Sequence, residues 1–381
     1  MVSNILLPWE LESEILVRVP ATYLKHWRFL CKRWYALFKD PKFTKKNSSL
    51  VKAETRMVLK RDQSIYSFSF NISGIHNRYD QFIEFTGKLR NLKSLEDVRI
   101  HEISYCEGLV LCTTKDNRLI VWNPCTCQTS KWIIPTTRYT SMLSKNFLGY
   151  DNNNSESCVS YKILSKNTTV SKYEMYDFNS DTWRLLDVGT DHDKWCVQSS
   201  GVFFKGNTYW LDYDNEDFNF ILRFDFTTER FERLSLPFVS DDYDDNLALS
   251  VVGEEKLAVL CQLLDCEFGE MKIWVTNAVT DGSKDLSWSV LVDFGKLVKN
   301  NMTNVTSFLV DEENKKVMCC AADMDDEQRI TIHVVGEGIC KQVYREVTQG
   351  SANDCPLLVG YVPSLVHIPA SQTNHGVKRK R

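Results

Sequence analysis

The chain has 381 residues, of which 43% are hydrophobic and 25% charged, and its formal net charge at pH 7 is -4. This composition is typical of a soluble globular protein, and the length allows one large β domain beside a small helical one. The sequence has no run of about 18 apolar residues and no basic stretch leading into an apolar one, so we expect neither a membrane span nor secretion. The 13 cysteines are therefore expected to be reduced thiols, most of them small core residues.

The N-terminal segment begins with an amphipathic helical pattern. Pro8 suits the first turn of a helix because it has no amide hydrogen and a fixed φ. Three glutamates follow it, where the helix dipole favours negative charge. Leu11, Ile15 and Val19 recur at four-residue spacing with Leu16 beside them, which predicts a single apolar face.

A second helical pattern follows Pro20, which ends the first helix and can begin another. Its apolar stripe has three- and four-residue steps: Leu24, Trp27, Leu30, Cys31 and Trp34. Leu37 and Phe38 extend the stripe until Asp40–Pro41 stops it. A unit of about 45 residues cannot bury all these side chains by itself, so its apolar faces need either the rest of the chain or another protein.

These residues closely resemble the F-box motif of plant F-box proteins over about residues 4–45. The matching positions are Leu7, Pro8, Leu11, Glu14, Ile15, Leu16, Arg18, Val19, Pro20, Leu24, Arg28, Cys31, Lys32, Trp34, Pro41 and Phe43. The sequence departs from the family at Trp9, often polar or acidic there, at Trp27, often Phe, and at Asn47, often His. The resemblance implies a three-helix F-box that binds a Skp-type adaptor and, through it, a cullin scaffold.

The resemblance also implies which side chains meet the adaptor. The candidate adaptor-binding residues are Leu7, Pro8, Leu11, Ile15, Leu16, Val19, Pro20, Leu24, Trp27, Cys31 and Trp34, of which the last four would also serve internal packing. Residues 1–50 are basic, with nine Lys and Arg against four Asp and Glu. Because these basic residues follow the F-box pattern and no groove-reading motif accompanies them, we expect no nucleic-acid partner.

After residue 50 the sequence changes to short β-rich runs separated by Gly, Asn and Asp. A weak repeat places Trp122, Tyr176, Phe224 and Trp274 about 50 residues apart, the period of a kelch-type propeller blade. Each unit contains a strand, a turn with Asn, Asp or Ser, and a second strand closed by an aromatic residue, and we expect the aromatics to pack between sheets. Gly206-Asn207 predicts a tight hairpin turn.

This part of the chain also resembles the F-box-associated domain of plant F-box proteins, over about residues 95–365. The resemblance rests on residues 108–112, 121–124, 147–151 and 206–211, and on the unit around Tyr176. It implies a kelch-like β-propeller that recruits a target protein. The double-glycine turns of kelch repeats are absent, so the number of blades stays open.

The predicted fold is therefore α+β and multi-domain, with a small helical unit before a large all-β propeller. The predicted domains are an F-box at 1–47, a connecting segment at 48–94 with the first strands of the β domain, the propeller at 95–368 and a flexible basic tail at 369–381. Propeller loops set specificity, so the loops near residues 151–154, 212–217 and 241–246 are candidate target contacts.

The sequence predicts no catalytic residue, metal ion or cofactor. The seven histidines are isolated, and no phosphate-binding loop or nucleophile motif is present. Cys125 and Cys127 would share one face of an alternating strand, but they have no second ligand pair at zinc-site spacing. We therefore expect reduced thiols rather than a metal site.

These observations predict a non-catalytic substrate-recognition subunit of a Skp–cullin–F-box ubiquitin ligase, which holds an unidentified target protein near the conjugating enzyme. A protein-binding propeller scaffold outside the ubiquitin system and a propeller enzyme are the alternatives. We expect neither a nucleic acid nor a membrane as a partner. The tail residues Lys378, Arg379, Lys380 and Arg381 form either a nuclear import signal or a solvated terminus, which predicts a location in the nucleus, the cytoplasm or both.

Overall fold

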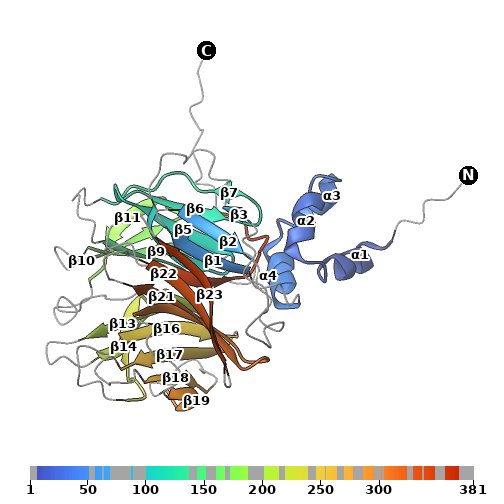
Figure 1. Cartoon of the computed structure of the whole chain (residues 1–381). Coiled ribbons are helices and arrows are strands. Elements are labelled where there is room, and N and C mark those ends of the chain that lie inside the picture. The colour runs from blue at the N-terminus through green and yellow to red at the C-terminus, as the bar shows by residue number, and fades with distance from the viewer. Residues whose placement is uncertain are drawn as a thin grey trace, which may run out of the picture.

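The structure is a computed structural model. It describes residues 7–50, 56–61, 64–68, 87–88, 100–136, 144–151, 160–167, 172–187, 201–213, 219–238, 246–253, 255–263, 270–277, 286–295, 302, 304–323, 329–336, 339–347 and 357–368. Helices come first and strands follow, and the helices lie together at one side of the β domain (Figure 1). None of the helices in these ranges combines the length and the apolar character needed to cross a membrane.

The helical unit contains four short helices in residues 7–50. They are α1 (Trp9–Leu16), α2 (Ala21–Trp27), α3 (Lys32–Leu37) and α4 (Pro41–Leu50). Pro8 and Pro20 occupy the N-caps of α1 and α2, as their fixed φ favours. The three expected helices are thus four, because the second apolar stripe is broken between Trp27 and Lys32. The stripe through Leu37 and Phe38 ends before Asp40–Pro41, as expected, and Pro41 also begins α4, where Asp40 accepts the Lys42 backbone N–H at 2.9 Å.

The β domain contains six four-stranded antiparallel sheets, which we call blades 1 to 6. With strands in their order within the sheet, blade 1 contains β24 (Leu357–Tyr361), β1 (Arg56–Arg61), β2 (Ser64–Phe68) and β3 (Gly87–Lys88). Blade 2 contains β4 (Ile100–Cys106), β5 (Leu109–Thr114), β6 (Leu119–Asn123) and β7 (Gln128–Thr129). Blade 3 contains β8 (Ser144–Asp151), β9 (Ser160–Asn167), β10 (Lys172–Asp177) and β11 (Thr182–Leu185). Blade 4 contains β12 (Val202–Phe204), β13 (Asn207–Tyr213), β14 (Asn219–Asp225) and β15 (Arg230–Leu234). Blade 5 contains β16 (Asn246–Val252), β17 (Lys256–Gln262), β18 (Met271–Thr276) and β19 (Trp288–Gly295). Blade 6 contains β20 (Val305–Asp311), β21 (Lys316–Asp323), β22 (Arg329–Gly336) and β23 (Ile339–Val347).

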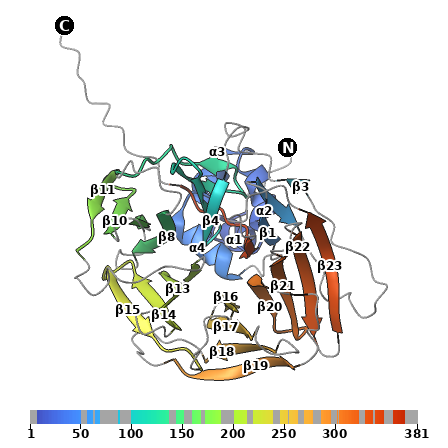
Figure 2. The same ribbon diagram turned by 60° about the vertical axis from the view of Figure 1, so that its left-hand side comes forward.

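The blades form a closed ring, with the first strand of each sheet toward the centre and the fourth toward the outside (Figure 2). Every neighbouring pair of blades shares a buried apolar cluster. The last strand, β24, pairs with β1 in blade 1, so both ends of the domain belong to one sheet. The α+β fold class with a β-propeller is confirmed, and the described sheets give the propeller six blades. Strands β1 to β3 lie within the predicted connecting segment at 48–94.

The sequence repeat corresponds to the third strand of four successive blades. Trp122, Tyr176, Phe224 and Trp274 lie on β6, β10, β14 and β18. The first three are buried between sheets, as expected.

The tight turn between β12 and β13 lies one residue earlier than predicted. Lys205 and Gly206 both have positive φ, 47° and 82°, whereas Asn207 pairs with Phe204 in the ladder. A two-residue hairpin of this kind needs positive φ at both central residues, and Asn207 is already extended.

Blades 3 and 4 approach closely at Gly149. Phe147 on β8 stacks on Trp210 of β13, with ring centroids 4.8 Å apart. A Cβ atom on Gly149 would lie 2.2 Å from the ring of Phe226. Any side chain at position 149 would therefore push the two blades apart.

Gly149→Ala should lower the free energy of unfolding by about 2–3 kcal/mol, because the added methyl group overpacks the blade 3–4 interface. Urea unfolding followed by tryptophan fluorescence measures this loss. Gly336→Ala is a matched control, since the nearest atom its Cβ would meet is Cγ of the Lys316 side chain at 3.1 Å, and the Lys315 backbone oxygen lies at an ordinary contact distance of 3.4 Å. Equal losses in the two variants would contradict the tight contact at Gly149.

Candidate functional site

Helix α1 has two apolar faces. Leu7, Leu11 and Ile15, spaced by four residues, have exposed fractions of 52%, 53% and 55%. Leu16 and Val17 face the opposite way and are buried in the helical core. The single apolar face predicted from the sequence is therefore two faces, and we call the exposed one, Leu7, Leu11 and Ile15, the outer stripe.

The side of α1 away from the outer stripe is tied to α3. The indole Nε1 of Trp34 donates a hydrogen bond to the Glu12 carboxylate, and Arg33 forms an ion pair with the same group at 2.8 Å. The Arg33 guanidinium also lies 4.4 Å from the centre of the Trp9 ring. These contacts fix which face of α1 points outward.

Asn47 ties the end of α1 to α4. Its buried side-chain amide donates to the backbone oxygens of Val17 and Val19, at 2.7 and 2.8 Å. These carbonyls follow α1, where the helix leaves acceptors without intrahelical partners. Asn47 therefore holds α1 against α4.

The candidate adaptor-binding residues divide by their burial. Pro8 and Cys31 are exposed, Pro20 is partly exposed, and Val19, Trp27 and Trp34 are half-buried. Leu16 and Leu24 are buried, at 4% and 0% exposure, so the structure places these two in the helical core rather than on the surface. Their side chains fill the space between the helices, which a stripe read from spacing alone does not show.

Sequence analysis missed an exposed apolar pair between α2 and α3. Phe29 and Leu30 are 73% and 68% exposed. The stripe pattern placed Leu30 on a continuous helical face, but the chain turns between Arg28 and Cys31. The pair therefore projects from a connection.

The propeller covers the inner face of the helices. Cys125, in the β6–β7 turn, and Leu365, after β24, join the buried cluster formed by α1, α2, α3 and α4. Arg28 also approaches the backbone oxygen of Thr126 at 3.5 Å. The helical unit thus uses one face against the propeller and leaves the outer stripe without a partner in the described parts of the chain.

Cys125 and Cys127 lie in this turn and not on a strand, so the expectation that they share a face is wrong. Cys125 is buried against the helices, whereas Cys127 is exposed and has a φ of 60°. Within the described residues, no three His, Cys, Asp or Glu side chains come together as a possible metal site.

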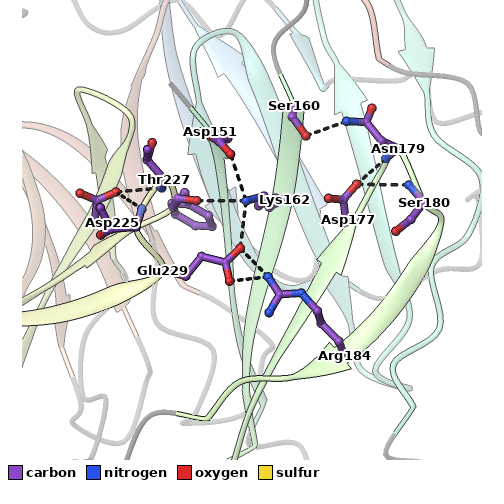
Figure 3. Close-up of polar contacts among 12 residues, drawn as sticks. Asp151, Ser160, Lys162, Asp177, Asn179, Ser180, Arg184, Asp225, Thr227 and Glu229 are labelled. Carbon is purple, nitrogen blue, oxygen red and sulfur yellow. Dashed lines mark hydrogen bonds and ion pairs between the residues drawn. The ribbon is translucent and has the colours of Figure 1, made fainter. Parts of the chain in front are cut away.

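A cluster of charges joins blades 3 and 4 (Figure 3). The buried ammonium group of Lys162 contacts Asp151 at 3.3 Å, Glu229 at 2.9 Å and the backbone oxygen of Phe226 at 3.2 Å. Arg184 binds the Glu229 carboxylate from the other side. Each charge in this cluster has an opposite charge beside it, which indicates a structural joint between blades.

The predicted target-binding loops lie almost entirely outside the described residues, as does the basic tail. At their edges, Asp151 is an ion-pair partner of Lys162, and Asp212 is buried.

Comparison with known proteins covers both units. Residues 5–46 match the F-box domain, and residues 56–368 match the F-box associated beta propeller domain. A putative F-box/kelch-repeat protein of Arabidopsis thaliana is 48% identical over 373 residues, covering 95% of this chain and 92% of that protein. A second one from the same plant is 47% identical over 389 residues, covering 98% and 99%. An F-box/kelch-repeat protein of this plant is 45% identical over 381 residues, covering 97% and 96%.

Glu229→Gln should weaken the acid sensitivity of the propeller. Burial opposes ionisation of Glu229, but hydrogen bonds from Arg184 and Lys162 outweigh it, so the pKa of this carboxyl lies below its ordinary value of 4.5. A carboxyl with a lowered pKa stabilises the fold fully above its ordinary pKa, and this contribution is lost as the pH falls through the lowered value. Urea midpoints measured from neutral pH down to about pH 3 should therefore fall more steeply for the unsubstituted chain than for the variant.

Glu312→Gln is the control for this titration, because it removes a more exposed ion pair with Lys256, 2.8 Å long, between blades 5 and 6. It should keep the acid slope of the unsubstituted chain. If Glu229→Gln keeps that slope as well, the charge cluster does not stabilise the blade 3–4 joint.

Proposed function

Because the chain belongs to the F-box proteins that carry an F-box-associated β-propeller domain, we propose that it is the substrate-recognition subunit of a Skp–cullin–F-box ubiquitin ligase. The F-box binds a Skp-type adaptor, which connects it to a cullin scaffold, and the propeller binds a target protein. The chain supplies no catalytic group, and ubiquitin transfer follows from holding the target close to the conjugating enzyme.

The observation that carries this proposal is the outer stripe of α1. Leu7, two residues before α1, and Leu11 and Ile15 on α1 are each more than half exposed, while Leu16 and Val17 on the other side are buried. An exposed helical stripe of this kind fits a partner with a matching apolar groove. Leu7, Leu11 and Ile15 would be the anchors, with Pro8 at the start of the helix beside them.

The charge of the F-box favours an acidic partner. Residues 1–50 carry nine basic side chains against four acidic ones. Glu12 and Glu14 are already ion-paired within the unit, whereas Lys32 and Lys45 are exposed. Complementary charge on the adaptor would speed association and make its rate depend on salt.

The propeller suits the role of a rigid target holder. Its six blades close into a ring, and the charge cluster around Lys162 joins two of them. Binding specificity would then reside in the loops between strands, which can vary without disturbing the sheets.

We also propose that the basic tail directs part of the protein to the nucleus. Lys378 to Arg381 are four consecutive basic residues, a composition that import receptors recognise. The protein would then act in both the nucleus and the cytoplasm.

Leu11→Gln combined with Ile15→Gln should abolish stable adaptor binding. Glutamine keeps the helix but removes two exposed anchors, and losing two anchors of about 2 kcal/mol each would weaken binding by about 1,000-fold. Calorimetry with a purified Skp-type adaptor and the full chain measures the affinity, and thermal unfolding should be unchanged because both side chains are exposed.

Leu185→Gln, an exposed leucine on β11, is the matched control and should bind the adaptor normally. Undiminished binding by the α1 variant would contradict the assignment of the outer stripe. A chain that never binds the adaptor would favour a scaffold outside the ubiquitin system.

Replacing Lys378, Arg379, Lys380 and Arg381 with alanine in a fluorescent fusion should lower the ratio of nuclear to cytoplasmic signal, because the import receptor loses its charged contacts. Imaging in plant cells measures this ratio. Lys32→Ala with Lys45→Ala, two exposed lysines of the F-box, controls for loss of charge alone. An unchanged ratio in the tail variant would show that the tail is only a solvated terminus.

A further inference from the structure

The chain passes between the propeller and the F-box after its last strand. Strand β24 ends at Tyr361, and residues 362–368 then contact both units. Leu365 is buried in the cluster of the F-box helices, whereas Val366 and Ile368 pack into the cluster between blades 2 and 3. Neighbouring side chains of one short segment thus belong to two different cores.

Asn123, at the end of β6, holds this segment in place. Its fully buried amide nitrogen donates to the backbone oxygens of Ser364 and Val366, at 3.0 and 2.7 Å. Its side-chain oxygen accepts from the backbone N–H groups of Cys125 and Thr126, at 2.9 and 3.0 Å. One side chain therefore shapes the β6–β7 turn and binds residues 362–368.

Glycine permits the close approach of the segment to blade 2. Gly108 lies in the β4–β5 turn with a φ of +84°, and a Cβ atom there would lie 2.3 Å from Cβ of Ser364. The segment is therefore seated between the β4–β5 turn and Asn123.

The equivalent turns of blades 3 and 4 show why position 123 needs an amide. Asp177 accepts from the backbone N–H groups of Asn179 and Ser180, and Asp225 accepts from those of Thr227 and Thr228 (Figure 3). These turns need only an acceptor, so aspartate serves. Blade 2 has the same acceptor geometry, but two backbone carbonyls also face the side chain, and only the amide of asparagine can donate to them.

A polar contact to blade 2 also holds the end of the segment that lies near the F-box cations. His367 shares a hydrogen bond of 2.7 Å with the Gln128 side chain on β7. Burial, with Lys39 and Arg28 nearby, lowers the pKa of His367, so the ring is neutral at neutral pH. A neutral ring can sit near the two F-box cations without repelling them.

We propose that residues 362–368 are a clasp, held by Asn123, that fixes the F-box in one orientation on the propeller. Leu365 inserts into the helical core, and Asn123 fixes the backbone on either side of it to blade 2 through its hydrogen bonds to Ser364 and Val366. Asn123 is thus a positioning residue for the adaptor-binding end. Its consequence for ubiquitin transfer rests on the proposed function, whereas the clasp itself does not.

Single-molecule energy transfer in the full-length chain tests this proposal. Dyes are attached through non-natural amino acids at two exposed positions, Lys45 on α4 and Val290 on β19. Asn123→Asp retains the acceptor for the turn but sets a carboxylate oxygen against the carbonyls of Ser364 and Val366. We expect one narrow distance distribution for the unsubstituted chain and a broadened or shifted one for Asn123→Asp.

Two matched controls separate the clasp from general effects. Asp177→Asn makes the reverse exchange in the equivalent turn of blade 3, where no clasp passes, and should leave the distribution narrow. Leu365→Glu, which places a charge at the centre of the clasp contact, should broaden it, whereas Leu185→Glu on exposed β11 should not.

A narrow, unchanged distribution in both Asn123→Asp and Leu365→Glu would overturn the clasp. Loss of the propeller's own thermal transition in Asn123→Asp would also overturn the positioning role, because Asn123 would then serve blade 2 itself. Affinity for a purified Skp-type adaptor is measured on unlabelled protein and should be unchanged in Asn123→Asp, because Asn123 lies outside the F-box core. If even the unsubstituted chain fails to bind the adaptor, the proposed ubiquitin-ligase function fails, while the distance distributions still decide the clasp.

Discussion

Pairing of the last strand with the first is the contact on which the arrangement of the whole chain depends. Arg56, the first residue of β1, pairs with Tyr361, the last residue of β24. Helix α4 ends at Leu50, a few residues before β1, and the proposed clasp begins directly after β24. Closing the ring therefore brings the F-box and the proposed clasp to the same end of blade 1, where β1 starts and β24 finishes. The strand pairing that removes the free edges of the propeller also determines where the adaptor-binding unit stands.

This placement resolves the shortage of core in the helical unit. Four short helices cannot bury apolar surface on all sides, and a segment of this size has little stability alone. The propeller supplies Cys125 and Leu365 to the inner face, so the core of the F-box is completed by a neighbour rather than by more helix. Because the inner face is satisfied in this way, Leu7, Leu11 and Ile15 can remain exposed without loss of the fold.

The sequence predicted features that depend on local pattern. Prolines marked the starts of α1 and α2, and the spacing of Trp122, Tyr176, Phe224 and Trp274 located the third strands of four blades. The sequence could not predict which apolar side chains of α1 are buried, because Leu11 and Leu16 are both apolar and periodicity does not say which one meets a neighbour. The number of blades was also beyond its reach, since blade 1 combines strands from opposite ends of the chain. The bond from Asn123 to Ser364 spans 241 residues, and no local pattern encodes such a contact.

A fixed orientation of the F-box on the propeller would matter for a protein that holds two partners close together. A non-catalytic adaptor accelerates a reaction only through the effective concentration it imposes between its two ends. On the proposed function, a freely moving F-box would spread the target over a large volume relative to the conjugating enzyme, whereas the proposed clasp would confine it. The cost of that confinement is met during folding, when Leu365 is buried and Asn123 forms its hydrogen bonds. On the proposed function, little further ordering would then be needed when the adaptor and the target bind.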